Sequence, residues 1–148
     1  MRHTADTTYR IRAHTTATGQ AHAQAGTETI TVDTGWDTEP SGLPGPGELL
    51  AAAFAACLLK NVERASQLLP FDYQGAEVNV VASRQDTPPK FVTIRYELRL
   101  DTDEPQRRVE LLHRNLQRYG TVYNTLATAC DVEGQVLTRP TAAGSTAG

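Results

Sequence analysis

Two cysteines, Cys57 and Cys130, are the residues of this chain best suited to covalent chemistry. A cysteine reacts through its thiolate, whereas a buried thiol behaves as a small hydrophobic side chain. Cys57 lies within Leu49–Leu59, a run in which every residue is apolar and many are alanine. In mid-helix it gains little from the helix dipole, which acts mainly within the first turn. A reactive thiol and a packed thiol are therefore both open interpretations of Cys57.

Glu48 is the second candidate, either as a polar site residue or as a first-turn glutamate that the helix dipole favours. It precedes Cys57 by nine positions, about half a revolution of a regular helix, so the two side chains would point in opposite directions. The four histidines, His3, His14, His22 and His113, show no HxH or HxxxH spacing, and the two cysteines form no CxxC motif. We therefore predict no metal site and no cofactor.

The element that must position Cys57 is a helix from Pro46 to Leu69, ended by Pro70. Because this helix is apolar on all sides over much of its length, we expect it to be surrounded. Alternating residues predict strands at 9–13, 21–25, 29–33, 75–84, 91–100 and 131–137, and apolar stripes predict helices from Asp103 to Gly120 and from Thr121. A Gly- and Pro-rich loop, 34–45, holds the only tryptophan, Trp36. The order β-β-β-α-β-β-α-α-β indicates an α+β fold with antiparallel sheets wrapped around a buried central helix.

Length and composition predict one domain over residues 1–140, with a flexible tail at 141–148. A net charge of -3 disfavours binding to nucleic acid or to an anionic membrane. No apolar run reaches the roughly 20 residues that span a bilayer, and the polar N-terminal residues do not have the pattern expected of a signal-peptide h-region. Two distant cysteines make no disulfide framework, so we expect a cytoplasmic protein. Because 148 residues can hardly surround such a helix, we also predict a homodimer.

The phrase GPGELLAAAFAACLLKNV, the turn DTPPK and the segment RNLQRYGTVYNTLATACDVEG, in this order of elements, resemble the osmotically inducible protein C and organic hydroperoxide resistance family (OsmC/Ohr). The resemblance implies an intertwined homodimer. It also implies reduction of organic hydroperoxides by two cysteines, the first of which matches Cys57. In that chemistry one thiolate attacks the peroxide and becomes a sulfenic acid, and a second thiol condenses with it. A nearby Arg and Glu favour the thiolate in this family.

The second family cysteine opens a Cys-Pro-Val phrase, which reads Gly120-Thr121-Val122 here. Gly120 thus replaces the resolving cysteine, and Cys130, ten residues farther on, cannot simply stand in for it. The family glutamate falls on Gly47, one residue before Glu48. The family arginine falls in residues 18–20, which contain none, although Arg10 or Arg12 could substitute for it.

Three functional hypotheses follow, the third of which is a structural relative whose site has lost its activity. In the first, the protein is a hydroperoxide reductase of stress defence that uses Cys57 and an external thiol. In the second, it is a non-catalytic relative that binds a small apolar ligand at the dimer interface. Gly120 would then open space above Cys57, and the lining of that pocket would come from Trp36, Tyr119, Tyr123 and Asn124.

Overall fold

A computed structural model describes residues 7–37 and 39–141. The order of elements is the predicted β-β-β-α-β-β-α-α-β, and the fold is of the α+β class. The chain divides into two compact units, residues 1–49 and 50–148, and each is described by itself. Most of the predicted tail, residues 142–148, lies outside the described residues. In the part of the chain that is described, no helix is long and apolar enough to span a bilayer.

The first unit holds an antiparallel meander of β1 (Arg12–Thr15), β2 (Gln20–Ala25) and β3 (Glu28–Asp33), as predicted. Both of its turns contain a glycine with positive φ, Gly19 at 80° and Gly26 at 64°, a conformation that glycine adopts without strain. The predicted first strand began at residue 9, but β1 begins three residues later. The register agrees with this later start, because Arg12 pairs with Gln24 and β2 ends at Ala25, one residue beyond that pair.

The helix α1 (Pro46–Leu68) buries one stripe of side chains at helical spacing: Phe54, Leu58, Val62 and Ala65. Its other side is open, because the exposed residues there include Ala52, Ala53, Ala56 and Leu59. Within the second unit, neighbouring elements therefore cover α1 on one side, and the complete burial expected of this helix would require a second chain. The prediction of a homodimer stays a prediction.

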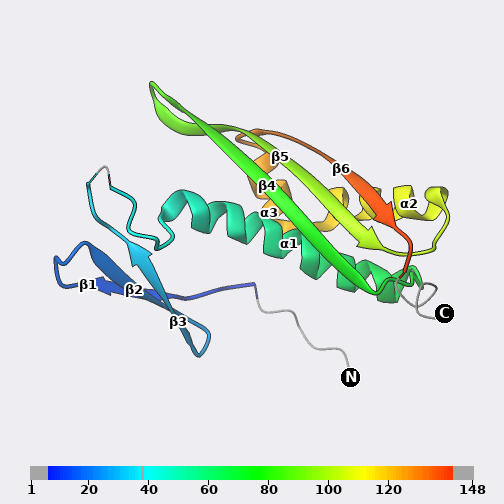
Figure 1. The fold of residues 1–148 in the computed structure, drawn as a ribbon, viewed down its shortest axis with the longest axis horizontal. Helices are drawn as coiled ribbons and strands as arrows, with labels where there is room; N and C mark the ends of the chain where they lie inside the picture. Colours follow the sequence, from blue (N-terminus) through cyan, green and yellow to red (C-terminus); the bar gives the residue numbers. More distant parts are fainter. Residues whose placement is uncertain (1–6, 38, 142–148) are drawn as a thin grey trace. The chain divides into compact units, whose positions relative to one another are not determined.

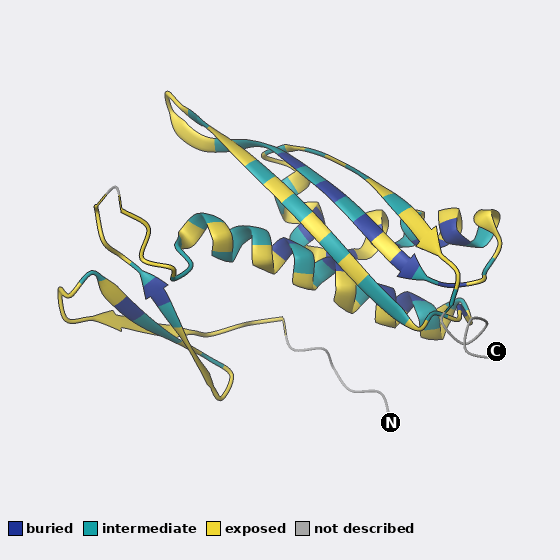
Figure 2. Cartoon of the chain, viewed as in Figure 1, coloured by how far each residue is buried: buried dark blue, intermediate teal, exposed yellow. Residues whose placement is uncertain are grey.

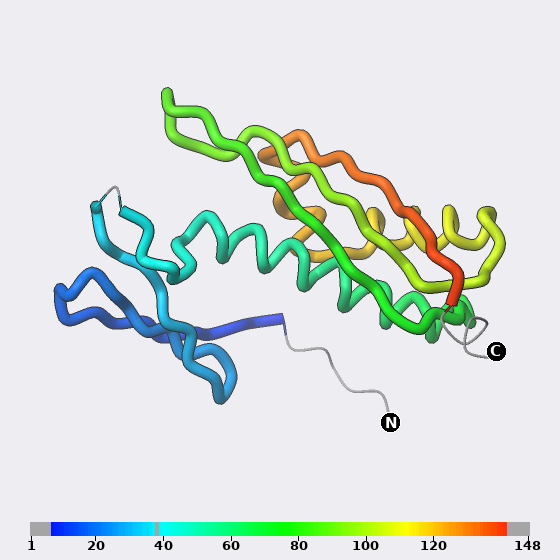
Figure 3. Tube along the Cα trace, viewed as in Figure 1, coloured from blue at the N-terminus to red at the C-terminus, as the bar shows by residue number. Residues whose placement is uncertain are grey.

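The second unit holds a sheet in the order β4 (Gly75–Asp86), β5 (Pro89–Asp101) and β6 (Asp131–Arg139). The predicted hairpin of β4 and β5 is confirmed, but β6 runs parallel to β5 rather than antiparallel (Figures 1 and 3). A parallel pair requires a crossover of a dozen or more residues. The two helices α2 (Gln106–Tyr119) and α3 (Thr121–Ala127) supply it.

The core of the second unit lies between this sheet and the three helices (Figure 1). Buried and less buried residues alternate along β5, as Figure 2 shows, because successive side chains of a strand point to opposite faces. The inward face of β5 packs against α1 and against the apolar stripe of α2, which comprises Val109, Leu112 and Leu116. The sequence predicted that this helix begins at Asp103, but α2 begins at Gln106 with Pro105 as its N-cap, and Asp103 accepts hydrogen bonds from Thr141 instead.

Candidate functional site

Cys57 is half-buried in α1 and has an amide group beside its sulfur. Asn61, one turn later on the same helical face, directs its Nδ2 to 3.6 Å from Cys57 Sγ and donates a 2.8 Å hydrogen bond to the Cys57 carbonyl oxygen. The second bond holds the amide in place. An N–H donor therefore lies beside the sulfur of Cys57.

Gly120, at the junction of α2 and α3, lies directly against this sulfur. A Cβ atom built on Gly120 would be 3.2 Å from Cys57 Sγ and 2.9 Å from the Cβ of Tyr123. Gly120, the residue predicted to replace a second cysteine, is therefore adjacent to Cys57. Gly120 is itself buried, so the missing side chain does not open a cavity within the chain. It allows the backbone to close over the sulfur instead.

Tyr123 belongs to a buried aromatic and polar network rather than to an open pocket. Its ring stacks on Phe54 at 5.4 Å, and its hydroxyl is 3.2 Å from that of Tyr96. The Tyr96 hydroxyl also lies 2.6 Å from His113 Nε2. Burial raises the pKa of Tyr96 and the hydrogen bond with Tyr123 adds to this, while burial lowers the pKa of His113. Sequence spacing placed Tyr96 on the inward face of its strand but gave no sign that His113 would join it.

The other residues of the predicted ligand pocket are exposed. Tyr119 is 46% exposed, and Asn124 donates a 3.0 Å hydrogen bond to the Arg118 carbonyl oxygen. Trp36 is fully exposed and belongs to the first unit. Gly120 and Tyr123 thus lie at the sulfur and in the core, whereas these three residues face solvent. A ligand site between two subunits stays a prediction.

Glu48 and Cys130, the remaining candidates, have local roles. Glu48 Oε1 accepts a 2.8 Å hydrogen bond from the Gly45 backbone N–H, which fixes the loop that enters α1. Cys130 is a half-buried free thiol whose Sγ lies 3.5 Å from the Phe91 carbonyl oxygen. Both residues therefore have structural partners of their own, and the assignment of Glu48 to the site stays a prediction.

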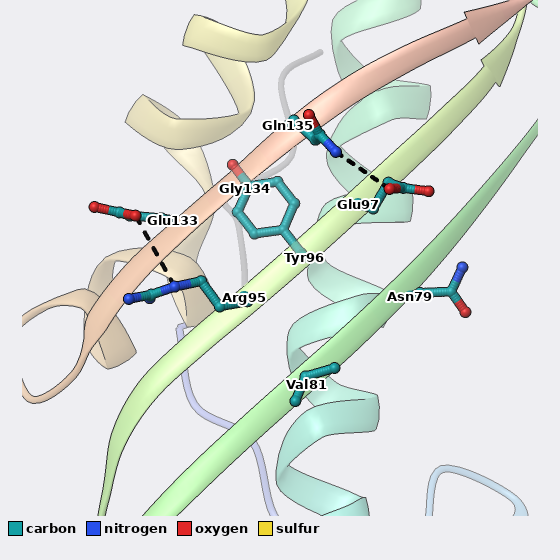
Figure 4. Close-up of a pocket in the computed structure, with 8 residues that line it drawn as sticks. All are labelled: Asn79, Val81, Arg95, Tyr96, Glu97, Glu133, Gly134 and Gln135. Atoms are coloured by element: carbon teal, nitrogen blue, oxygen red, sulfur yellow. Dashed lines mark hydrogen bonds and ion pairs between the residues drawn. The ribbon is translucent and has the colours of Figure 1, made fainter.

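A shallow hollow of about 500 Å³ lies on the outward face of the β4–β5–β6 sheet (Figure 4). Arg95 forms ion pairs there with Asp131 at 2.9 Å and Glu133 at 3.9 Å. Gln135 donates to Glu97 at 3.2 Å. These exposed groups form hydrogen bonds and ion pairs with one another, and Cys57 lies on α1, at the inward face of the sheet. The hollow is therefore a solvated sheet surface rather than the site.

Comparison with known proteins places this chain in a family. Residues 37–134 match the family model described as OsmC-like protein. The chain belongs to this family. No protein with a curated description matches the sequence.

Solved structures resemble this OsmC-like protein in fold over most of its length. The OsmC-like protein of Mycoplasma pneumoniae is 18% identical with a TM-score of 0.81, and the match covers 90% of this chain and 99% of that one. The organic hydroperoxide resistance protein OsmC of Legionella pneumophila is 20% identical, with a TM-score of 0.72 and coverages of 90% and 99%. OhrB of Bacillus subtilis, also an organic hydroperoxide resistance protein, is 16% identical, with a TM-score of 0.63 and coverages of 87% and 97%. These likenesses concern the fold.

Proposed function

We propose that this OsmC-like protein reduces organic hydroperoxides, with Cys57 as the attacking thiolate and an external thiol as the reductant. The Cys57 sulfur attacks the terminal peroxide oxygen, a sulfur–oxygen bond forms, and the oxygen–oxygen bond breaks. The alkoxide leaves as an alcohol after it takes up a proton. Cys57 becomes a sulfenic acid.

The observation that carries this proposal is the arrangement around Cys57 Sγ. Cys57 is half-buried, its sulfur lies 3.6 Å from the Asn61 amide nitrogen, and a Cβ on Gly120, which the family resemblance matches to a second cysteine, would lie 3.2 Å from it. A cysteine that served only for packing would need no such donor beside its sulfur. The names of the Legionella and Bacillus structures, organic hydroperoxide resistance proteins, point to the same chemistry.

The reductant must come from outside, because Gly120 has no sulfur. One molecule of thiol attacks the sulfenic acid, which gives a mixed disulfide with Cys57 and releases water. A second molecule attacks the mixed disulfide, restores the Cys57 thiol and leaves as the symmetrical disulfide. The two thiols together supply the two electrons that the peroxide accepts.

We also propose that the working form is a homodimer. The exposed side of α1 supports this, since Ala52, Ala53, Ala56 and Leu59 form an apolar helix face next to the stretch that holds the reactive cysteine. The molar mass in solution tests the proposal, and a monomer at micromolar concentration would contradict it.

The activity test is the consumption of cumene hydroperoxide in the presence of dithiothreitol. We expect turnover by the wild type and by Cys130→Ser, and only the uncatalysed rate with Cys57→Ser. Mass spectrometry of the wild type treated with peroxide alone should show one added oxygen on Cys57. Equal rates for wild type and Cys57→Ser would refute the proposed function.

A further inference from the structure

Two arginines stand beside the junction that covers Cys57. The guanidinium carbon of Arg64, in α1, lies 4.9 Å from the centre of the Tyr119 ring, and that of Arg118 lies 5.3 Å from the same centre. Tyr119 directly precedes Gly120, the residue in contact with the sulfur. We refer to Arg64, Arg118 and Tyr119 as the arginine cluster.

The arginines of this cluster lack the carboxylate partners that others in the same unit have. Salt bridges to carboxylates are formed by Arg95, Arg99, Arg108 and Arg139. Within residues 7–37 and 39–141, Arg64 and Arg118 form no salt bridge, and the Arg64 guanidinium has only a long 3.4 Å hydrogen bond to Asn115. A guanidinium has five N–H donors, so most of these remain available. Two like charges held near one ring also repel each other, and a bound anion would relieve this repulsion.

We propose that the arginine cluster binds the carboxylate of the small thiol that reduces oxidised Cys57. This inference rests on the proposed function and names the class of its second substrate, a low-molecular-mass thiol that carries a carboxylate. The planar, forked guanidinium matches a carboxylate in shape and charge. An external thiol is required in the first place because Gly120 has displaced the internal one.

The reach of the cluster suits such a molecule. Arg64 follows Cys57 by seven residues, so its Cα lies about 10 Å farther along α1 and close to the same helical face. Side chains of a helix lean toward its N-terminus, which directs the Arg64 guanidinium back toward the level of Cys57. Both guanidinium groups lie against Tyr119, the residue before the one that lies on the sulfur, so a thiol of the length of a cysteine derivative or a short peptide thiol is the molecule that suits this arrangement.

The test uses the full-length protein with Cys130→Ser, so that Cys57 is its only thiol. Methyl methanethiosulfonate converts Cys57 to a neutral methyl disulfide, and the rate at which an added thiol cleaves it is measured without any peroxide. The two probes are N-acetylcysteine, which carries a carboxylate, and N-acetylcysteamine, which has the same skeleton without it. Rates are compared at equal thiolate concentration.

With both arginines changed, Arg64→Gln and Arg118→Gln, we expect the rate with N-acetylcysteine to fall about tenfold and the rate with N-acetylcysteamine to change less than about twofold. Added salt should slow the first reaction and not the second. The matched control is Arg107→Gln with Arg114→Gln, which removes the same charge from exposed positions of α2 and should leave both rates unchanged. The pair Arg64→Lys and Arg118→Lys should retain part of the effect.

An equal loss with both thiols, or no loss with either, would overturn the inference. So would a double variant that oxidises more slowly only with a carboxylate-bearing hydroperoxide, because the cluster would then serve the oxidant. Failure of Cys57 to oxidise with any hydroperoxide would refute the proposed function alone, since the disulfide measurement does not depend on it. If methyl methanethiosulfonate fails to modify Cys57, the sulfur is closed to small thiol reagents and both proposals fall.

Discussion

The substitution Gly120→Cys would place a second sulfur directly over Cys57. The backbone at Gly120 has φ -75° and ψ 118°, which any L-residue adopts without strain. A Cβ there would be 3.2 Å from Cys57 Sγ. A disulfide needs about 3 Å between the sulfur of one cysteine and the Cβ of the other, given its S–S bond of about 2.05 Å. We therefore expect a disulfide with Cys57 to form after only a small adjustment.

Two opposing terms set the stability of this variant. The new bond would close a loop of 63 residues, which lowers the entropy of the unfolded chain enough to stabilise the fold by about 4 kcal/mol. The added Cβ, at 2.9 Å from the Cβ of Tyr123, is too close and costs about 1–3 kcal/mol. The reduced variant should thus be less stable than the wild type by about 1–3 kcal/mol, and the oxidised variant more stable by about the same amount.

Urea unfolding with and without a phosphine reductant, in a Cys130→Ser background, measures both differences. Gly120→Ser is the matched control, because it has nearly the same steric cost but should show no dependence on redox state. Titration of free thiols in the folded, oxidised variant reports the bond directly. Two titratable thiols there, or equal urea midpoints in both redox states, would show that Gly120 does not lie on Cys57 and would refute the geometry on which the site depends.

Three further predictions concern the surroundings of this site. Gly134→Ala should destabilise the fold by about 1–3 kcal/mol in urea unfolding, because its Cβ would lie 2.4 Å from atoms of the Tyr96 ring, which two hydrogen bonds hold in place; wild-type stability would contradict this. Burial lowers the pKa of His113, so below about pH 6.5 the unfolded chain takes up a proton that the native protein does not. The free energy of unfolding should therefore decrease as the pH is lowered below about 6.5, and it should decrease less in His113→Gln. Equal pH dependence of the two free energies would exclude this cause. Asn61→Leu should slow alkylation of Cys57 several-fold because it removes the N–H donor 3.6 Å from the sulfur, whereas an unchanged rate would show that the amide does not assist the reaction of Cys57.

The sequence predicted the elements of the fold well, because long segments carried clear periodicity. Alternation along residues 91–100 specified β5 and its inward face, which the structure confirms. The direction of β6 was not predictable in the same way. A strand of nine residues carries no mark of whether its neighbour runs parallel or antiparallel, and only the packing of α2 and α3 decides this.

The site was predictable in outline from Cys57 and Gly120, and its details were not. Family spacing placed Gly120 at the position of a second cysteine, but a missing side chain suggested open space where the backbone in fact closes in. The contacts of Tyr96 with His113 and of Arg64 with Tyr119 join residues far apart in the sequence. Nothing in local pattern indicates such pairs, because they depend on how helices and sheet face one another.

The parallel pairing of β6 also has a consequence for the order of folding. The β4–β5 hairpin closes through a tight turn, whereas Asp131 pairs with Thr93, 38 positions earlier, and must wait for the intervening helices. Loop-closure entropy makes contacts between distant residues slow to form. Until β6 arrives, β5 presents a bare edge of unpaired amide groups, which is the kind of template that other chains can join. Aggregation during refolding should therefore compete with the docking of β6, and rapid dilution to low protein concentration should raise the yield of native protein.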